Sequence, residues 1–155
     1  MALEMDLELE GDTPDWNACS EAARITGVSE LTMTNGRLTD GEFSRSGTYF
    51  RRAKGGVGDE GELSPVRAEG SHGCSFLTRY RIVFRINNGL YDESVEDIKD
   101  FVAHLARLSP MKFVLSFQLE GVYAVRCARE LEWFWHEPRD ANWRPSTTQQ
   151  KEPRR

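Results

Sequence analysis

Cysteine and histidine are scarce in this chain of 155 residues, with three of each. Cys19, Cys74 and Cys127 lie far apart and form no C-x-x-C pair. An odd number of widely spaced cysteines favours neither a disulfide framework nor a zinc site. We therefore predict free thiols in a reducing compartment, and neither a metal nor a cofactor.

Long hydrophobic runs are also missing. No apolar stretch approaches the roughly 20 residues that a membrane-spanning helix requires. At the N-terminus leucine and methionine alternate with acids, whereas a signal peptide needs a basic start and a continuous apolar segment. These absences predict a cytoplasmic location and no membrane partner.

Sequence motifs of the common enzyme classes are absent as well. The chain has no phosphate-binding G-x-x-x-x-G-K-S/T loop, no dinucleotide-binding G-x-G-x-x-G turn, no H-E-x-x-H zinc motif and no G-x-S-x-G nucleophile elbow. His72 and Cys74 are close in sequence, but nothing near them supplies an orienting group or an oxyanion hole. His104 borders a predicted apolar helix stripe, where a structural role is favoured. We therefore predict no enzymatic activity.

The remaining composition is that of a globular domain. Hydrophobic residues make up 39% of the chain and charged residues 29%, and the length suits a single domain. The formal net charge of −5 argues against nucleic acid as the main partner, because binding phosphates needs a surplus of lysine and arginine. We predict one folded domain over residues 1–136 and a flexible polar tail over 137–155.

Hydrophobic patterning in the first half predicts a strand, a helix and a meander. Leucine and methionine alternate with acids from residue 3 to 10, which is typical of a strand with its acidic face in water. Thr13 as N-cap and Pro14 at the first helical position predict a helix near 14–26. Asn35-Gly36 predicts a type I′ hairpin turn, and residues 30–53 match two or three short antiparallel strands.

The second half repeats this order of elements. Residues 79–86 alternate apolar side chains with arginines, which predicts a strand with a basic outer face. Ser94 begins a capping-box pattern, and the apolar stripe that follows predicts a helix near 95–108. Residues 113–127 match a hairpin, and Leu131, Trp133 and Trp135 match a final strand.

Together these elements predict an α+β fold built from two strand-helix-β-meander halves, residues 1–53 and 76–136. The glycine-rich segment 54–75 joins the halves as a long loop. We expect two helices and antiparallel sheet, in one sheet or more, and whether the halves form a true pseudo-repeat stays open. The first strand is acidic on its outer face and the strand at 79–86 is basic, so we predict that these two strands are neighbours.

Acids in the glycine-rich loop and tryptophans late in the chain are the candidate partner-binding residues: Asp59, Glu60, Glu62, Trp133, Trp135 and Trp143. Tryptophan is a preferred anchor in protein interfaces, and acids suit a basic target. Core packing is the favoured role of Trp133 and Trp135, whereas Trp143 has polar sequence neighbours. We therefore predict a non-enzymatic protein-binding protein that acts as a stoichiometric inhibitor.

In overall character, residues 1–136 resemble the small immunity proteins that bacteria encode beside secreted polymorphic or contact-dependent toxins. The resemblance rests on the strand-helix-meander halves, the acidity, the lack of a targeting signal and the late tryptophans. It implies inhibition of a cognate toxin, and it carries over no functional residue because no motif matches. The alternative hypothesis is a single-stranded nucleic-acid-binding protein, in which charge and stacking come from Arg79, Arg81, Arg85, Tyr49 and Tyr80.

Overall fold

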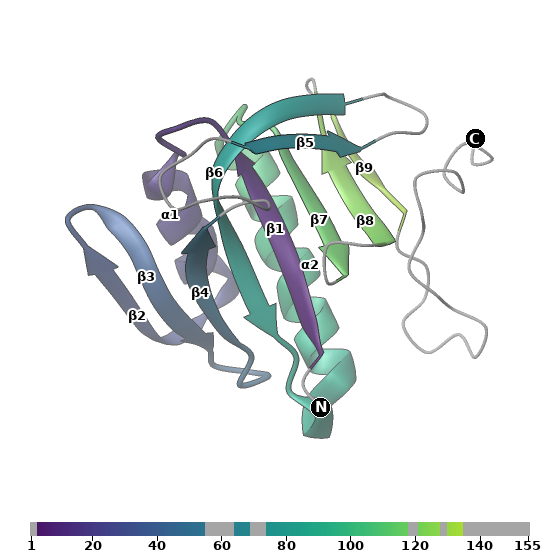
Figure 1. Cartoon of the computed structure of the whole chain (residues 1–155). Helices are drawn as coiled ribbons and strands as arrows, with labels where there is room; N and C mark the ends of the chain where they lie inside the picture. Colours follow the sequence, from purple (N-terminus) through teal and green to yellow (C-terminus); the bar gives the residue numbers. More distant parts are fainter. Residues whose placement is uncertain (1–2, 55–63, 69–73, 118–120, 128–129, 135–155) are drawn as a thin grey trace.

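The computed structural model describes residues 3–54, 64–68, 74–117, 121–127 and 130–134. The strands of these residues are β1 (Glu4–Glu10), β2 (Val28–Thr34), β3 (Arg37–Phe43), β4 (Tyr49–Lys54), β5 (Ser64–Ala68), β6 (Cys74–Arg85), β7 (Phe113–Phe117), β8 (Gly121–Arg126) and β9 (Leu131–Trp133). They form one antiparallel sheet in the order β2-β3-β4-β6-β1-β7-β8-β9, with β5 paired to β6. Helices α1 (Trp16–Thr26) and α2 (Tyr91–Leu108) cover one face of the sheet (Figure 1). The predicted α+β class is confirmed.

The two lead strands, β1 and β6, are antiparallel neighbours at the centre of the sheet. Glu4 lies opposite Arg85 and Glu8 opposite Arg81, so the neighbour relation predicted from charge is confirmed. Strand β4 flanks β6, and β7 flanks β1. The first meander starts at the sheet edge with β2, whereas the second ends at the opposite edge with β9. The halves therefore share an order of elements along the chain but not an order of strands in the sheet.

Helix α1 begins two residues later than the sequence pattern predicted. Asp15 is the N-cap, because its carboxylate accepts a hydrogen bond from the backbone N–H of Ala18. The predicted cap at Thr13, with Pro14 in the first turn, is therefore wrong. Both residues precede the helix, where proline fits the turn into the cap equally well.

Helix α2 begins four residues earlier than predicted, at Tyr91. Ser94 lies inside the helix, and its hydroxyl oxygen accepts a hydrogen bond from the backbone N–H of Asn87 instead of capping a helix end. A short 3-10 turn, Asn88–Leu90, leads into the helix. The capping-box pattern here stabilises the approach to the helix and not its first turn.

The glycine-rich segment is not the uninterrupted loop that its composition predicted. Strand β5 lies within it and pairs with the beginning of β6, with Val66 opposite Phe76. Pro65 is compatible with this strand, since β5 pairs on one side alone and an edge strand tolerates a missing donor. We call β5 together with residues 74–78 of β6 the β5–β6 arm. The arm bends away from the central strands and extends toward β8 (Figure 1).

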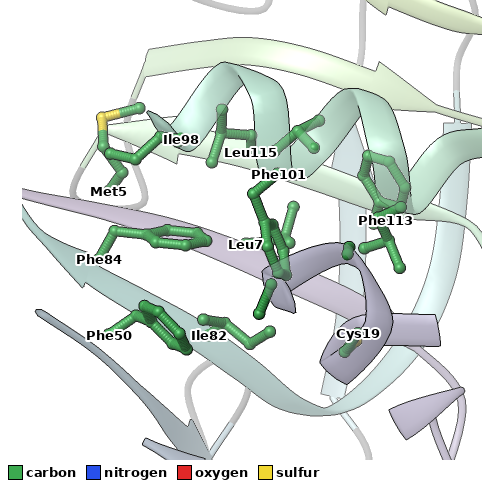
Figure 2. Close-up of a cluster of buried hydrophobic side chains, with 14 of the residues drawn as sticks. Met5, Leu7, Cys19, Phe50, Ile82, Phe84, Ile98, Phe101, Phe113 and Leu115 are labelled. Carbon is green, nitrogen blue, oxygen red and sulfur yellow. The ribbon is translucent and has the colours of Figure 1, made fainter. Parts of the chain in front are cut away.

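The main core fills the space between the sheet and the two helices. Leu7 of β1 and Phe84 of β6 face α2, where Phe101 packs with its ring centroid 5.4 Å from that of Phe84 (Figure 2). Phe43 and Phe50 add a further ring pair at 4.8 Å. These side chains are fully buried, so this aromatic cluster anchors α2 to the centre of the sheet.

A smaller cluster lies on the sheet face without helices. It contains Cys74, Val114, Val122, Val125 and Phe134, and we call it the helix-free cluster. Cys74 belongs to the β5–β6 arm, whereas Val114 and Val125 belong to β7 and β8. The arm therefore packs over this part of the sheet.

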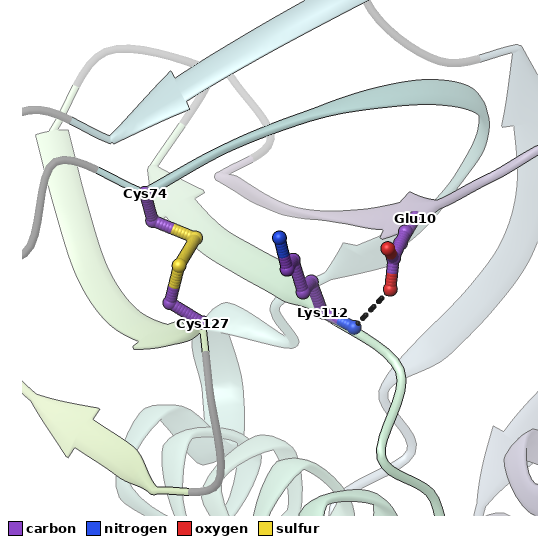
Figure 3. Close-up of a disulfide and its surroundings, with 4 residues drawn as sticks. All are labelled: Glu10, Cys74, Lys112 and Cys127. Atoms are coloured by element: carbon purple, nitrogen blue, oxygen red, sulfur yellow. Dashed lines mark hydrogen bonds between the residues drawn. A yellow bond between two sulfur atoms is a disulfide. The ribbon is translucent and has the colours of Figure 1, made fainter.

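A disulfide joins Cys74 in the arm to Cys127 at the end of β8 (Figure 3). This bond overturns the prediction of free thiols and with it the argument for a reducing compartment. The fold brings the two Cα atoms to 5.5 Å although 53 positions separate them in sequence. Cys19, the free cysteine of the described residues, is buried in the main core. Neither described helix is long and apolar enough to cross a membrane.

Candidate binding face

The face of β2, β3, β4, β6 and β1 that points away from the helices carries a dense set of charges. Met5 and Leu7 of β1 face the helices. Because side chains along a strand alternate between the two faces of the sheet, those of Glu4, Asp6 and Glu8 point away from the helices. The registers of the neighbouring strands place on the same side Glu30, Asp40, Glu42, Tyr49, Arg51, Arg81 and Arg85. We call these ten side chains the charged face. Its carboxyls outnumber its guanidinium groups.

The inner part of the charged face is paired internally. Nη2 of Arg85 lies 3.4 Å from Oε2 of Glu4, and Nε of Arg81 donates to Oδ1 of Asp6 at 2.9 Å. Arg79, two residues before Arg81 on β6, pairs with Asp12. The three arginines on which the nucleic-acid hypothesis depended therefore each have a carboxylate partner within the chain, which leaves less positive charge for phosphates.

The outer part of the charged face differs from the inner part because it contains exposed carboxylates without an ion pair to another described residue. Glu30 on β2 lies directly opposite Glu42 on β3, and both side chains are exposed. Neither carboxylate forms an ion pair with another described residue. Tyr49 on β4 is also exposed and donates a hydrogen bond to Asp40 at 3.2 Å. Like charges opposite one another destabilise a strand pair, so this acid pair lacks an internal reason for its position.

Glu8 and Asp6 differ from the other acids of the charged face because they are buried. The exposed fraction of Glu8 is 9% and that of Asp6 is 4%, so neither lies in water as the alternation of β1 suggested. Asp6 is instead paired with Arg81, as the opposite charges of the two strands predicted. Burial, reinforced by the charge of Asp6, raises the pKa of Glu8 to about 7, although Arg81 opposes the shift. The alternation of β1 could not show this burial, because it identifies two faces but not what covers each of them.

Of the candidate residues from the sequence, the structure describes Trp133, which does not lie on the charged face. Trp133 is half-buried against the main core, and Nζ of Lys99 on α2 lies 5.9 Å from its ring centroid. The favoured packing role of Trp133 is confirmed. The other candidates lie outside the described residues: Asp59, Glu60, Glu62, Trp135 and Trp143.

Tyr80, proposed for base stacking, is already engaged within the protein. The guanidinium carbons of Arg37 and Arg52 lie over its ring, at 5.7 and 5.6 Å from the centroid. The ring of Trp16 meets it edge-on at 5.7 Å. A nucleobase would have to displace one of these neighbours before it could stack.

Side chains with catalytic potential do not converge in the described part of the chain. Cys74 is in a disulfide and has no thiol to activate. His72 and His136 lie outside the described residues, and half-buried His104 lies beside Arg107, with 3.1 Å between Nδ1 and Nη2. No group of three or more His, Cys, Asp or Glu side chains within the described ranges could hold a metal ion.

An open cleft of about 530 Å³ lies between the end of β1 and the end of α2. Its lining residues are Glu10, Gly11, Asp12, Thr13, Asp15, Ser109, Pro110 and Met111. Asp15 caps α1, and Oε1 of Glu10 accepts the backbone N–H of Lys112 at 2.8 Å (Figure 3). Because Asp12 pairs with Arg79, each acid of this cleft already has a structural role.

Comparison of the chain with protein-family models, curated proteins and solved structures finds no match. A functional hypothesis therefore depends on the geometry of the chain itself. Of the surfaces described, the outer part of the charged face alone combines exposed, uncompensated charge with an exposed aromatic ring and the open edge of a sheet.

Proposed function

We propose that this chain is a non-enzymatic binding protein whose partner is a protein with a basic surface. The observation that carries the proposal is the exposed pair Glu30 and Glu42, which face each other across β2 and β3 without an ion pair to any cation of the described ranges. An arginine or lysine of the partner between these carboxylates would replace a repulsion by two attractions. Arginine fits best, because its planar guanidinium can donate to both carboxylates.

Two neighbouring features suit protein binding. Strand β2 is an edge strand, so its outer N–H and C=O groups are open to an added strand. Tyr49, on the same face two strands away, is 39% exposed and offers an aromatic ring with a hydroxyl. Tyrosine is enriched at the energetic centres of interfaces because it combines apolar area with a polar end.

We further propose that the bound protein is inhibited, as the resemblance to bacterial immunity proteins suggests. A basic partner is what an acidic inhibitor would require, since an enzyme that acts on a polyanion has a basic active-site surface. The sequence predicted the cytoplasm, whereas the disulfide between Cys74 and Cys127 favours an oxidising compartment.

A charge-matched pair of variants tests the binding face. Glu30→Gln with Glu42→Gln removes the acid pair of the sheet, and Glu96→Gln with Asp100→Asn removes two exposed acids from α2, on the helix side. Each double variant loses two acids, so the net charge is the same. Proteins captured from lysate by the unaltered chain are identified by mass spectrometry, and their affinity for each variant is then measured.

The proposal expects a basic protein that binds one-to-one, whose activity falls on binding. Its affinity should drop at least tenfold for the Glu30 and Glu42 variant, since charge pairs at interfaces typically contribute more than 1 kcal/mol. The Glu96 and Asp100 variant should bind as the unaltered chain does. Equal losses in both variants would contradict the assignment of the face, and recovery of nucleic acid alone would contradict the proposed class of partner.

One observation favours the alternative, single-stranded nucleic-acid binding. Arg37 and Arg52 flank Tyr80 without an ion pair to any described carboxylate, so this end of the sheet carries uncompensated positive charge. A fluorescent oligothymidine would test it by anisotropy over a series of salt concentrations. Binding that weakens steeply with salt and is lost in Arg37→Gln would support this alternative.

A further inference from the structure

We propose that Glu8 is a proton-binding switch that controls how firmly the β5–β6 arm closes on the helix-free side of the sheet. This inference is independent of the proposed function, because Glu8 is buried and does not belong to the exposed acid pair. It depends on two observations. The neighbouring carboxyls of Asp6 and Glu8 share one cationic partner, Arg81, and Glu8 lies beside Val114, which packs with the arm.

One guanidinium group serves two buried carboxyls at the centre of the sheet. Glu8 lies opposite Arg81 on one side and opposite Val114 on the other. Arg81, however, donates through Nε to Asp6, two residues along the same face. Glu8 makes no hydrogen bond or ion pair with any other described residue. An unpartnered carboxylate in such a place is costly, whereas the protonated acid is neutral.

A buried hydroxyl beside the two acids is not used by either of them. Ser116 on β7 lies opposite Asp6 and is 3% exposed, and its hydroxyl has no partner among the described residues. Burial also raises the pKa of Asp6, despite its bond to Arg81. Besides Arg81, the charges of Glu4 and Arg51 act on Asp6, and Glu10, Arg79 and Lys112 lie further along β1 and on the neighbouring segments. Arg79 is paired with Asp12 and Glu10 with a backbone N–H, so neither relieves Glu8.

The apolar neighbour of Glu8 connects its charge to the arm. Val114 belongs to the helix-free cluster, in which Cys74 of the arm is buried and Phe76 of the arm is partly buried. A negative charge on Glu8 is more stable in water, and we infer that lifting the arm from Val114 would expose the neighbouring Glu8 carboxyl to more water. The Cys74–Cys127 disulfide holds the end of the arm, so the opening is local rather than a complete release.

The direction of the pH effect follows from the raised pKa. In the open arm Glu8 titrates near its ordinary value of 4.5, and in the closed arm near 7. The closed arm is therefore favoured most below about pH 4.5, and the advantage is lost as the pH rises toward 7. Above pH 7 the arm opens more often.

Hydrogen exchange measures this opening directly. Protection factors of the amides in residues 74–78, corrected for intrinsic exchange, are measured from pH 5 to pH 8 in the unaltered chain, in Glu8→Gln and in Glu4→Gln. Glu4→Gln is the matched control, because it makes the same chemical change on the same face of β1 at a partly exposed position. A carbon-13 NMR titration of the Glu8 carboxyl reports its protonation independently.

The switch predicts that protection in the unaltered chain and in Glu4→Gln falls by tenfold or more between pH 5 and pH 8. Protection in Glu8→Gln should stay nearly constant, and the Glu8 carboxyl should titrate well above 4.5. A titration at the ordinary value overturns the proposal. So does a Glu8→Gln protein whose protection falls with pH as steeply as that of the unaltered chain.

Discussion

Breaking the Cys74–Cys127 bond should lower the free energy of unfolding by up to about 4 kcal/mol. The bond closes a loop with a sequence separation of 53, and the loop-closure entropy for that length is about 14 cal/mol/K, or about 4 kcal/mol at 25 °C. This value is an upper limit, because a compact denatured state has less entropy to gain. The effect should therefore lie between about 2 and 4 kcal/mol.

Urea unfolding, monitored by tryptophan fluorescence and by circular dichroism, measures this loss in the free energy of unfolding. The unaltered chain is compared with and without reductant, beside Cys74→Ser with Cys127→Ser and the control Cys19→Ser. Reduction should lower the midpoint of the unaltered chain and of the control, and should leave the double variant unchanged. The slope m should also rise on reduction, since the unlinked denatured chain exposes more surface.

Two results would refute the reasoning. If reductant changes the unfolding free energy by less than about 0.5 kcal/mol, the bond does not constrain the denatured chain as the loop length requires. If the double variant is as sensitive to reductant as the unaltered chain, the effect does not come from this bond. Mass spectrometry of the alkylated protein without reduction supplies the direct check, with one free thiol expected.

Three further substitutions test the packing and the charges. Gly41→Ala should cost about 1–3 kcal/mol in thermal unfolding, because an added Cβ would lie 2.5 Å from Cζ of Phe50. Phe101→Ala should cost about 3–5 kcal/mol in urea, since the ring is fully buried in the aromatic cluster. Arg81→Leu should cost up to about 3 kcal/mol at pH 8 and less as the pH is lowered, because burial raises the pKa of Asp6 and a protonated Asp6 needs no cation, and unfolding at high and low pH measures the difference. An equal cost at both would contradict the pairing.

Local patterns in the sequence were sufficient to predict most elements and one tertiary contact. Asn35 and Gly36 have φ of 53° and 77°, as the predicted type I′ turn requires. The opposite charges of Glu4 and Arg85 predicted that β1 and β6 pair, because such patterns reflect contacts between neighbouring strands. These predictions succeeded where the deciding interaction is local or where both partners leave a pattern in the sequence.

Features that depend on distant residues could not be predicted in the same way. Cys74 and Cys127 carry no local signal of pairing, and the arm that brings them together contains a strand hidden in a glycine-rich segment. The burial of Glu8 could not be predicted either, because alternation along β1 shows which residues share a face but not which part of that face is covered. The acid pair of Glu30 and Glu42 could be recognised only from the register of β2 and β3, which shifts at two irregularities along these strands.

The acid pair has a competing explanation, which is protection of the sheet edge. Charged residues on edge strands prevent sheets of different molecules from pairing, and Glu30 lies on edge strand β2. Glu42 discriminates between the two roles, because it lies on β3, one strand inside the edge. If the pair only protects the edge, Glu30→Gln alone should cause self-association in sedimentation velocity, and Glu42→Gln should have no effect. If the pair binds a cation of a partner, each single variant should stay monomeric and should weaken partner binding to a similar extent, since the cation contacts both carboxylates.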